Sequence, residues 1–302
     1  MQRANAINSA SSIRYRSRVA LRWMALRGVL YTTLLLLTLV FGFPFFWTVT
    51  TSLKTGPELG IFPPLVFPRE PQWQNYVRVF TLFRYPVGRW FLNSTYVVAL
   101  STLGTMLTST LVAYGFARFR FRGKSLLFMV TLGTMMLPSQ VTLIPQFLLF
   151  YNIDWVNTFK PLWVPSWFGG GAFYIFLMRQ FFMTLPKEFD EAARIDGANY
   201  WRIFWSVLMP LCKPALATLG IIAFMENWNS FVGPLIYLNR SQQYTVAVGL
   251  RFFHMSPESA YREPIQNVLM AATILTLIPC LAIFFGGQTY FIRGIVMSGI
   301  KG

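Results

Sequence analysis

The chain has few charged residues for its length. Only 12% of its 302 residues are Asp, Glu, Lys or Arg, whereas a soluble domain carries roughly 25%. A deficit of this size excludes an ordinary soluble domain, because most of a soluble surface needs polar cover. Together with 55% apolar residues and a mean hydropathy of +0.48, it indicates a chain whose solvent is largely a lipid bilayer.

Residues that carry out chemistry are also scarce. The single histidine, His254, leaves little material for histidine-based metal sites or catalytic triads. The two cysteines, Cys212 and Cys280, lie at or inside apolar runs and are expected to be buried thiols rather than a disulfide framework. The G-x-x-x-x-G-K-[ST] loop that binds nucleotide phosphates is missing. We therefore expect no catalytic residue, no metal and no cofactor bound by this chain.

Positive charge is in excess, with 26 Lys and Arg against 10 acids and a net charge of +16. Such an excess can serve nucleic-acid binding, but here the basic residues are gathered in short segments between long apolar runs. That distribution is typical of residues that set orientation in a membrane. The sequence therefore predicts a lipid bilayer as partner and no nucleic acid.

The apolar runs predict an all-α membrane protein with six transmembrane helices. The first run has no charge between Arg27 and Lys54, and its length of roughly 33 Å as a helix is enough to cross a bilayer. The expected spans are Val29–Thr50, Trp90–Ala117, Ser125–Phe150, Trp163–Met183, Pro214–Leu238 and Ile265–Ile292, with Pro138 and Pro145 interrupting the third and Gly169–Gly171 forming a weak point in the fourth.

An even number of spans puts both termini on one side, and the charge distribution says which side. Seventeen Lys and Arg fall on the side of the termini and nine on the other, so the richer side is expected to be cytoplasmic. This gives a cytoplasmic arm at 1–28, a six-helix membrane domain at 29–292 and a cytoplasmic tail at 293–302. The two large external connections, 54–89 and 239–264, are rich in proline or aromatic residues. They fit equally well as contact surfaces for a partner and as loops lying on lipid headgroups.

A polar loop at 186–214 interrupts this apolar pattern on the cytoplasmic side. Its acids near Pro186 favour the start of a helix, and Gly197 predicts a turn between two short helices. A short helix with alanines on one side can enter a cleft on another protein, and a carboxylate at its edge can pair with a cation there. The alternative is an amphipathic cytoplasmic helix with no docking role.

The loop carries a longer pattern that favours docking. It reads Glu191-Ala192-Ala193-Arg194-Ile195-Asp196-Gly197-Ala198, followed by Phe204, Pro210 and Pro214. This resembles the EAA loop of permease subunits in binding-protein-dependent ABC importers, with Met209 where leucine is usual. The resemblance implies that the loop docks on a separate ATPase, through the residues Glu191, Ala192, Ala193, Asp196, Gly197, Ala198 and Pro210.

Further stretches resemble the carbohydrate-uptake branch of this family, in particular the six-span subunit of maltose importers. They are Phe43–Trp47, Thr51–Lys54, Trp90–Ser94, Asn227–Phe231 with Pro234-Leu235, and Gly299–Gly302. The family usually has an acid where this chain has Ser230. The resemblance implies a second, related permease subunit, two ATP-binding subunits inside and a sugar-binding protein outside. It places the chain in a bacterial or archaeal cytoplasmic membrane, where it imports a sugar or oligosaccharide.

One acid, Glu226, lies inside a predicted span, where a carboxylate is costly and usually faces water or the bundle interior. Its neighbours Asn227, Trp228 and Asn229 are residue types that bind sugars, so the four are candidates for the substrate pathway. Helix packing and a neutral, hydrogen-bonded Glu226 are the alternatives.

For the whole chain the alternatives are another importer substrate, such as a glycerol phosphate or polyol, a polytopic membrane enzyme, and a channel or secondary transporter. A membrane enzyme would need a cluster of acids, His or Cys, and the chain has none beyond the loop. A secondary transporter commonly shows an internal repeat, and we see no clear repeat.

Overall fold

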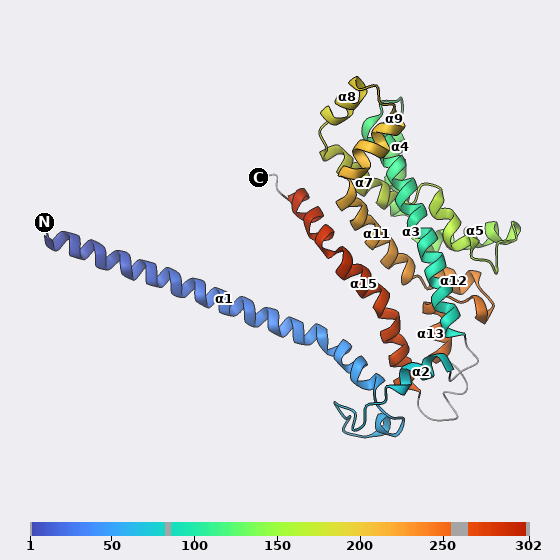
Figure 1. The fold of residues 1–302 in the computed structure, drawn as a ribbon, viewed down its shortest axis with the longest axis horizontal. Coiled ribbons are helices and arrows are strands. Elements are labelled where there is room, and N and C mark those ends of the chain that lie inside the picture. Colours follow the sequence, from blue (N-terminus) through green and yellow to red (C-terminus); the bar gives the residue numbers. More distant parts are fainter. Residues whose placement is uncertain (1, 82–85, 255–264, 300–302) are drawn as a thin grey trace.

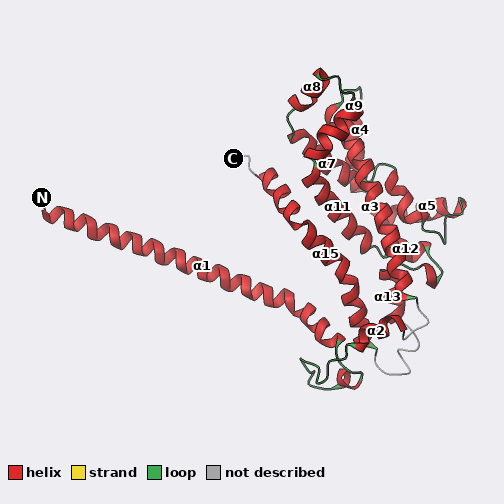
Figure 2. Ribbon diagram, in the orientation of Figure 1, coloured by secondary structure: helices red, strands yellow, loops and turns green. Residues whose placement is uncertain are grey.

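The computed structural model describes residues 2–81, 86–254 and 265–299, and in that part of the chain every regular element is a helix (Figures 1 and 2). The elements are α1 Gln2–Ser52, η1 Pro57–Gly60, α2 Gln74–Thr81, α3 Val87–Arg118, α4 Lys124–Gly133, η2 Thr134–Met136, α5 Ser139–Asn152, α6 Lys160–Trp163, η3 Val164–Trp167, α7 Ala172–Thr184, α8 Glu188–Ile195, α9 Tyr200–Arg202, η4 Ile203–Leu208, α10 Met209–Leu211, α11 Lys213–Trp228, α12 Val232–Tyr237, η5 Ser241–Gln243, α13 Val246–His254 and α15 Gln266–Gly299. Parts of the predicted external connections, 82–85 and 255–264, and the end of the tail, 300–302, lie outside the described residues.

Three straight helical stretches are long and apolar enough to cross a membrane: Trp23–Ser52, Val87–Arg118 and Gln266–Gln288. Two further pairs of helices reach that length only if each bent pair counts as one span, which would raise the number to five. The pairs are Lys124–Met136 with Ser139–Asn152, bent by 98°, and Tyr200–Leu211 with Lys213–Trp228, bent by 80°. The helical, membrane-spanning character predicted from composition is therefore present in the fold.

The predicted third, fourth and fifth spans are not continuous helices. The third bends at Pro138, which caps α5, whereas Pro145 lies inside α5 without ending it. The fourth is interrupted at Gly169–Gly171, and α7 has only 13 residues, or roughly 20 Å of helix against a hydrocarbon core of about 30 Å. The fifth ends at Trp228, before a separate short helix, α12. The sequence marks the breaks at Pro138 and at Gly169–Gly171, but it gives no sign of the break after Trp228.

Gly170 shows why the glycine triplet is needed. Its φ is +68°, and a Cβ at this position would lie 2.7 Å from the carbonyl oxygen of Thr105 in α3. Both the left-handed backbone and the close approach exclude a larger residue. The break before α7 therefore lets the chain press directly against the central helix.

Helix α3 is the centre of the bundle, with α7 and α11 packed along it and α15 packed on α11 (Figure 1). One apolar core lies where α3, α7 and α11 meet the segment Tyr200–Leu211, and includes Tyr114, Phe182, Phe204, Leu208 and Leu219. A second core lies toward α2 and α13, and includes Val79, Trp90, Trp228, Val246 and Val268. In Figure 1, α8 and α9 sit at one end of the bundle and α2 and α13 at the opposite end. We call these the α8 end and the α2 end.

Helix α1 stands away from the bundle along most of its length (Figure 1). None of its most apolar window is buried, and Leu39, Phe41 and Phe43 are more than half exposed. Within Trp23–Ser52 the enclosed part is the last turn, where Thr50, Thr51 and Ser52 are buried and the helix meets α15. An apolar helix left bare in a single chain requires lipid or another protein around it.

Candidate functional site

The loop predicted to carry the docking function folds into the α8 end. Helix α8 begins with acids in its first turn, where the positive end of the helix dipole favours them. It ends at Ile195, and two residues on, Gly197 has a φ of +76° that allows two closing hydrogen bonds, from Gly197 N to Arg194 O at 3.0 Å and from Ala198 N to Ala193 O at 2.9 Å. This pair of bonds is the Schellman termination of a helix. The predicted turn between two short helices is therefore present at Gly197.

The chain then enters a second helical segment that anchors the loop to the bundle. The Asn199 side chain caps it by accepting from the Arg202 N–H at 2.8 Å. Ile203, Phe204 and Leu208 are buried in the core against α3 and α7. Trp201 and Trp205 remain exposed at 60% and 50%. One face of this segment is therefore part of the protein core, and the other face is open.

An ion pair joins α8 to the end of α3. Arg118 Nε lies 3.1 Å from Asp190 Oδ2, and both side chains are nine-tenths or more buried. Arg118 also donates from Nη2 to the carbonyl oxygen of Leu185 at 3.1 Å, so one guanidinium holds the segment before α8 and α8 itself. Burial raises the pKa of the Asp190 carboxyl, while the positive charges of Arg118 and Arg194 oppose this rise.

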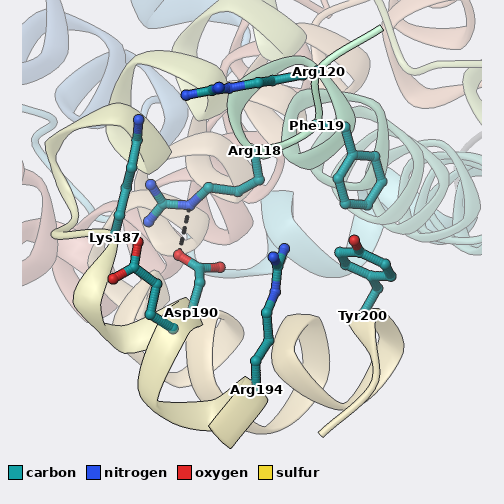
Figure 3. A pocket seen from close by; sticks show the side chains of 8 residues that line it. Arg118, Phe119, Arg120, Lys187, Asp190, Arg194 and Tyr200 are labelled. Carbon is teal, nitrogen blue, oxygen red and sulfur yellow. Dashed lines mark ion pairs between the residues drawn. The ribbon is translucent and has the colours of Figure 1, made fainter.

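A hollow of about 620 Å³ opens beside this ion pair. Its lining residues are Arg118, Phe119, Arg120, Lys187, Asp190, Glu191, Arg194 and Tyr200. Figure 3 shows the long basic side chains arranged around Asp190, and the Arg194 guanidinium lies 4.9 Å from the centre of the Tyr200 ring. Because the cations outnumber the acids, the hollow is positively charged beside a helix whose outer edge is acidic.

The residues of the predicted docking pattern divide between two faces. Ala193 and Ala198 are half-buried and pack on the core that holds Phe204. The others are exposed: Glu191, Ala192, Asp196, Gly197 and Pro210. Ile195, one turn along from Glu191, is 87% exposed, which is unusual for an isoleucine. The outward face of α8 thus carries small side chains, acidic residues at its edge and one large apolar side chain.

Two residues important for this site were not predicted as partners. Arg118 is one of the cations counted on the side of the termini and Asp190 is one of the acids near Pro186, and their contact depends on how α3 meets α8. Tyr114 was missed altogether. Its hydroxyl donates to the Tyr200 carbonyl at 3.3 Å, and its ring lies 5.1 Å from that of Phe204. Nothing in the local sequence signals either contact.

The four candidate pathway residues, three in the last turn of α11 and Asn229 just after it, have different surroundings. Glu226 is exposed, and its Oε2 accepts a hydrogen bond from the buried Tyr174 hydroxyl of α7. Trp228 is only 6% exposed, stacks on Phe224, and donates to a carbonyl of α15. Asn227 and Asn229 each donate to a carbonyl one turn earlier in the same helix. Trp228 therefore packs against neighbouring helices, whereas the Glu226 carboxylate is exposed.

Comparison with known proteins decides the family. Residues 106–297 match the family model described as the binding-protein-dependent transport system inner membrane component. The chain belongs to this family. The match spans α8, the core around Phe204 and all of α11, so the site described above lies inside the family's shared region.

Relatives of known name agree with this assignment. The chain is 33% identical to the sn-glycerol-3-phosphate transport system permease protein UgpE of Yersinia enterocolitica, over 89% of this chain and 95% of the relative. It is 30% identical to the arabinooligosaccharides transport system permease protein AraQ of Halalkalibacterium halodurans, over 86% of this chain and 91% of the relative.

A solved structure has the same fold, with a TM-score of 0.78 and 24% identity, covering 87% of this chain and 96% of the other. It belongs to a bacterial ABC transporter involved in the import of the acidic polysaccharide alginate. The predicted ABC importer permease is confirmed, as is a transport subunit rather than an enzyme. This family member is an inner-membrane component.

Proposed function

We propose that this chain forms half of the translocation pathway of an ATP-driven importer, and that α8 is the part on which an ATPase acts. The observation that carries the proposal is the two-sided build of α8. Its inner side is fastened by Asp190 and Ala193, and its outer side presents Glu191, Ala192 and Ile195 to solvent. A helix that is bare on one side and fixed on the other suits a part that another protein pushes.

In this mechanism two ATP-binding subunits close around nucleotide and move the clefts in which the coupling helices sit. The motion passes from α8 along two routes. One is the Arg118–Asp190 ion pair to α3, and the other is the packed core around Phe204 to α7 and α11. Dense packing transmits displacement because side chains in contact cannot be compressed. Since α3, α7 and α11 are the inner helices of the bundle, displacement of α8 reaches the pathway itself.

The direct test is to change the outward face of α8 without touching its fastening. Glu191→Lys reverses the charge that would pair with a cation on the ATPase, and Ala192→Trp places a large ring where a cleft must close. Both positions are exposed, so we expect a melting temperature within a few degrees of the parent. We expect ATPase co-purification and substrate uptake in reconstituted vesicles to fall at least tenfold.

A matched control makes the test specific. Glu70→Lys reverses an exposed acid in the 54–81 connection, near the α2 end, and should leave ATPase association unchanged. Normal uptake in both α8 variants would contradict the docking role of α8. Loss of association in the Glu70 variant as well would mean that net charge, rather than α8, is responsible.

We further propose that α1 is covered by a second, related permease subunit. The helix is apolar, and its side chains are exposed along the length that would cross a bilayer. It contacts the bundle through its C-terminal turn.

The proposed orientation has six crossings, with α7 as a short fourth span, and places both termini and α8 on the cytoplasmic side. It follows the excess of Lys and Arg there. The α2 end would then face an extracytoplasmic binding protein. Cysteine labelling at position 192 and position 70 from opposite sides of the membrane tests this orientation.

For the substrate we propose a sugar or oligosaccharide, because relatives with arabinooligosaccharide names cover nearly the whole chain. The alternative is a phosphorylated substrate, because other relatives are named as permeases for sn-glycerol 3-phosphate. Glu226 favours a neutral substrate such as a polyol over an anionic one. A carboxylate exposed along the proposed pathway repels an anion, and this repulsion is stronger in a low dielectric. ATPase stimulation of the reconstituted complex by binding proteins loaded with neutral sugars or with glycerol phosphate distinguishes the two. In Glu226→Gln the discrimination between them should narrow.

A further inference from the structure

A second basic site lies apart from the hollow beside α8, in a groove between α4 and α7. The groove has a volume of about 260 Å³ and is lined by Lys124, Ser125, Phe128, Met129, Leu132 and Arg179. Of its two cations, Lys124 is the first residue of α4 and Arg179 belongs to α7. The remaining long side chains that line the groove are apolar. Neither the docking role of α8 nor the pathway uses these residues.

Arg179 is the first sign that a partner is missing. Its guanidinium lies over the Phe128 ring at 4.1 Å, and its Nε atom is buried without a hydrogen-bond acceptor. Within the described residues the one ion pair is Arg118–Asp190, so no acid of that part of the chain neutralises Arg179. A buried donor left without an acceptor is costly, and more so when it is charged.

Lys124 gives the second sign. Its ammonium group donates to the Phe119 carbonyl at 2.9 Å, which uses one of its three protons. The charged groups that act on it are Arg179, Lys187 and Arg120, all of them cations. Placing Lys124 and Arg179 in one groove without an acid is unfavourable unless an anion lies between them.

The shape of the groove identifies the kind of anion. Beyond the two cations the lining is Phe128, Met129 and Leu132, and the neighbouring face of α4 exposes Leu126, Leu127 and Val130 by more than half. A free phosphate would satisfy the cations but would leave this apolar strip bare. A molecule with an anionic head and an apolar tail matches both parts, and in a membrane that molecule is an anionic phospholipid.

We propose that the α4–α7 groove binds an anionic phospholipid, with its headgroup phosphate between Lys124 and Arg179 and an acyl chain along Phe128, Met129 and Leu132. The bound lipid joins the start of α4 to α7, the helix that leads directly into α8. It therefore stabilises the bundle next to the moving loop, and the composition of the surrounding leaflet acts on the transporter through this contact.

Native mass spectrometry of the full-length protein, purified with the subunits that it retains, tests the proposal. The probes are phosphatidylglycerol and phosphatidylcholine of the same acyl chains. We expect the parent to retain phosphatidylglycerol preferentially. The double variant Lys124→Gln/Arg179→Gln should bind it at least tenfold more weakly, because two charge-assisted contacts are lost. The matched control Arg122→Gln/Arg202→Gln removes two exposed cations at the same end that do not line the groove, and should bind like the parent.

A third variant separates the headgroup from the tail. Met129→Trp fills the apolar strip and keeps both cations, so it should lose phosphatidylglycerol while keeping its melting temperature in detergent. Equal retention of both lipids by the parent, or equal loss in the control, overturns the proposal. Displacement of phosphatidylglycerol by millimolar inorganic phosphate would indicate a free-anion site and also overturns it. Cross-links from position 124 to an ATPase, with lipid retention unchanged in the double variant, would assign the groove to a protein partner instead.

Discussion

The two ends of the bundle are held together by different kinds of interaction. At the α8 end, aromatic and aliphatic side chains such as Phe204 and Leu208 fill a core, and one ion pair, Arg118–Asp190, crosses between helices. The α2 end also has an apolar core, around Trp90 and Val246, but there side-chain amides and a carboxylate additionally hold backbone groups one by one. Both ends thus have an apolar core, and the α2 end adds a network of directional hydrogen bonds to it.

The α2 end is organised around the backbone of Lys54. The Asn75 amide donates to the carbonyls of Ser52 at 2.8 Å and Lys54 at 3.0 Å, and Asn267 of α15 donates to the Lys54 carbonyl at 2.8 Å. These amides are buried. They tie α1, the loop after it and α15 at one point, so relative movement there would break hydrogen bonds.

A carboxylate completes this network. Glu58 accepts from the backbone N–H groups of Thr55 and Arg69, each at 2.8 Å. Burial acts to raise the pKa of the Glu58 carboxyl, but these N–H donors and the charge of Arg69 outweigh burial and hold the pKa below its usual value.

The difference fits two mechanical roles. Hydrogen bonds depend steeply on angle and distance, whereas apolar contact is non-directional and survives small sliding movements. An end that adds a hydrogen-bond network to its apolar core suits a fixed platform, and an end held mainly by its apolar core suits a joint that passes on motion. Four changes, from the largest expected effect to the smallest, test this contrast.

Phe204→Ala should have the largest effect. The ring is 2% exposed and lies 5.1 Å from the Tyr114 ring, so its removal leaves a cavity and costs about 3–5 kcal/mol. We expect a lower melting temperature and faster proteolysis within 186–214, with 54–81 still protected. Phe62→Ala is the control, because Phe62 is 91% exposed and should change stability little. Equal loosening of both ends would mean that they are not separate units.

Asp190→Ala should come next. It leaves Arg118 buried without its partner, at a cost of roughly 3 kcal/mol, the low end for buried pairs because this one borders an open hollow. The double variant Arg118→Leu/Asp190→Leu removes both charges and should recover much of the stability, but not the coupling of ATP hydrolysis to uptake. A double-mutant cycle on unfolding and uptake measures both. Full recovery of uptake would show that the ion pair carries no motion.

Asn75→Leu tests the α2 end. It keeps the side-chain volume but removes both donors, which leaves the Ser52 carbonyl unpaired and should cost about 1–3 kcal/mol. Hydrogen exchange should rise in the 54–76 segment and stay unchanged in α8. The conservative variant Asn75→Gln should retain part of the protection. Faster exchange in α8 would show that the platform and the joint are coupled in the resting protein.

Glu58 gives the smallest and the only pH-dependent effect. Because its folded pKa lies below the ordinary value of about 4.3, ionised Glu58 stabilises the folded loop. That contribution is present above the ordinary value and disappears as pH falls through the lowered folded pKa. Proteolysis of the 55–69 loop should therefore rise on acidification, and Glu58→Gln should remove that pH dependence. A parent loop insensitive to acid would show that Glu58 does not hold it.

Much about this protein could be read from sequence because the signals are local. Membrane residence follows from the low charge and the apolar runs, and the family follows from a contiguous pattern around Glu191. The turn at Gly197 follows from one residue that tolerates a positive φ. Each of these signals depends on neighbours within a few positions, so the linear order of residues contains it.

Only the tertiary structure decided which distant residues meet. The sequence marked Pro138 and the glycines at 169–171 as interruptions of the third and fourth spans, but it gave neither the 98° bend of the third span nor the end of α11 at Trp228. The pairing of Arg118 with Asp190 and the burial of Trp228 depend on where whole helices pack. Hydropathy measures how much surface a segment will bury, whereas the packing of neighbouring helices determines against which partner it is buried.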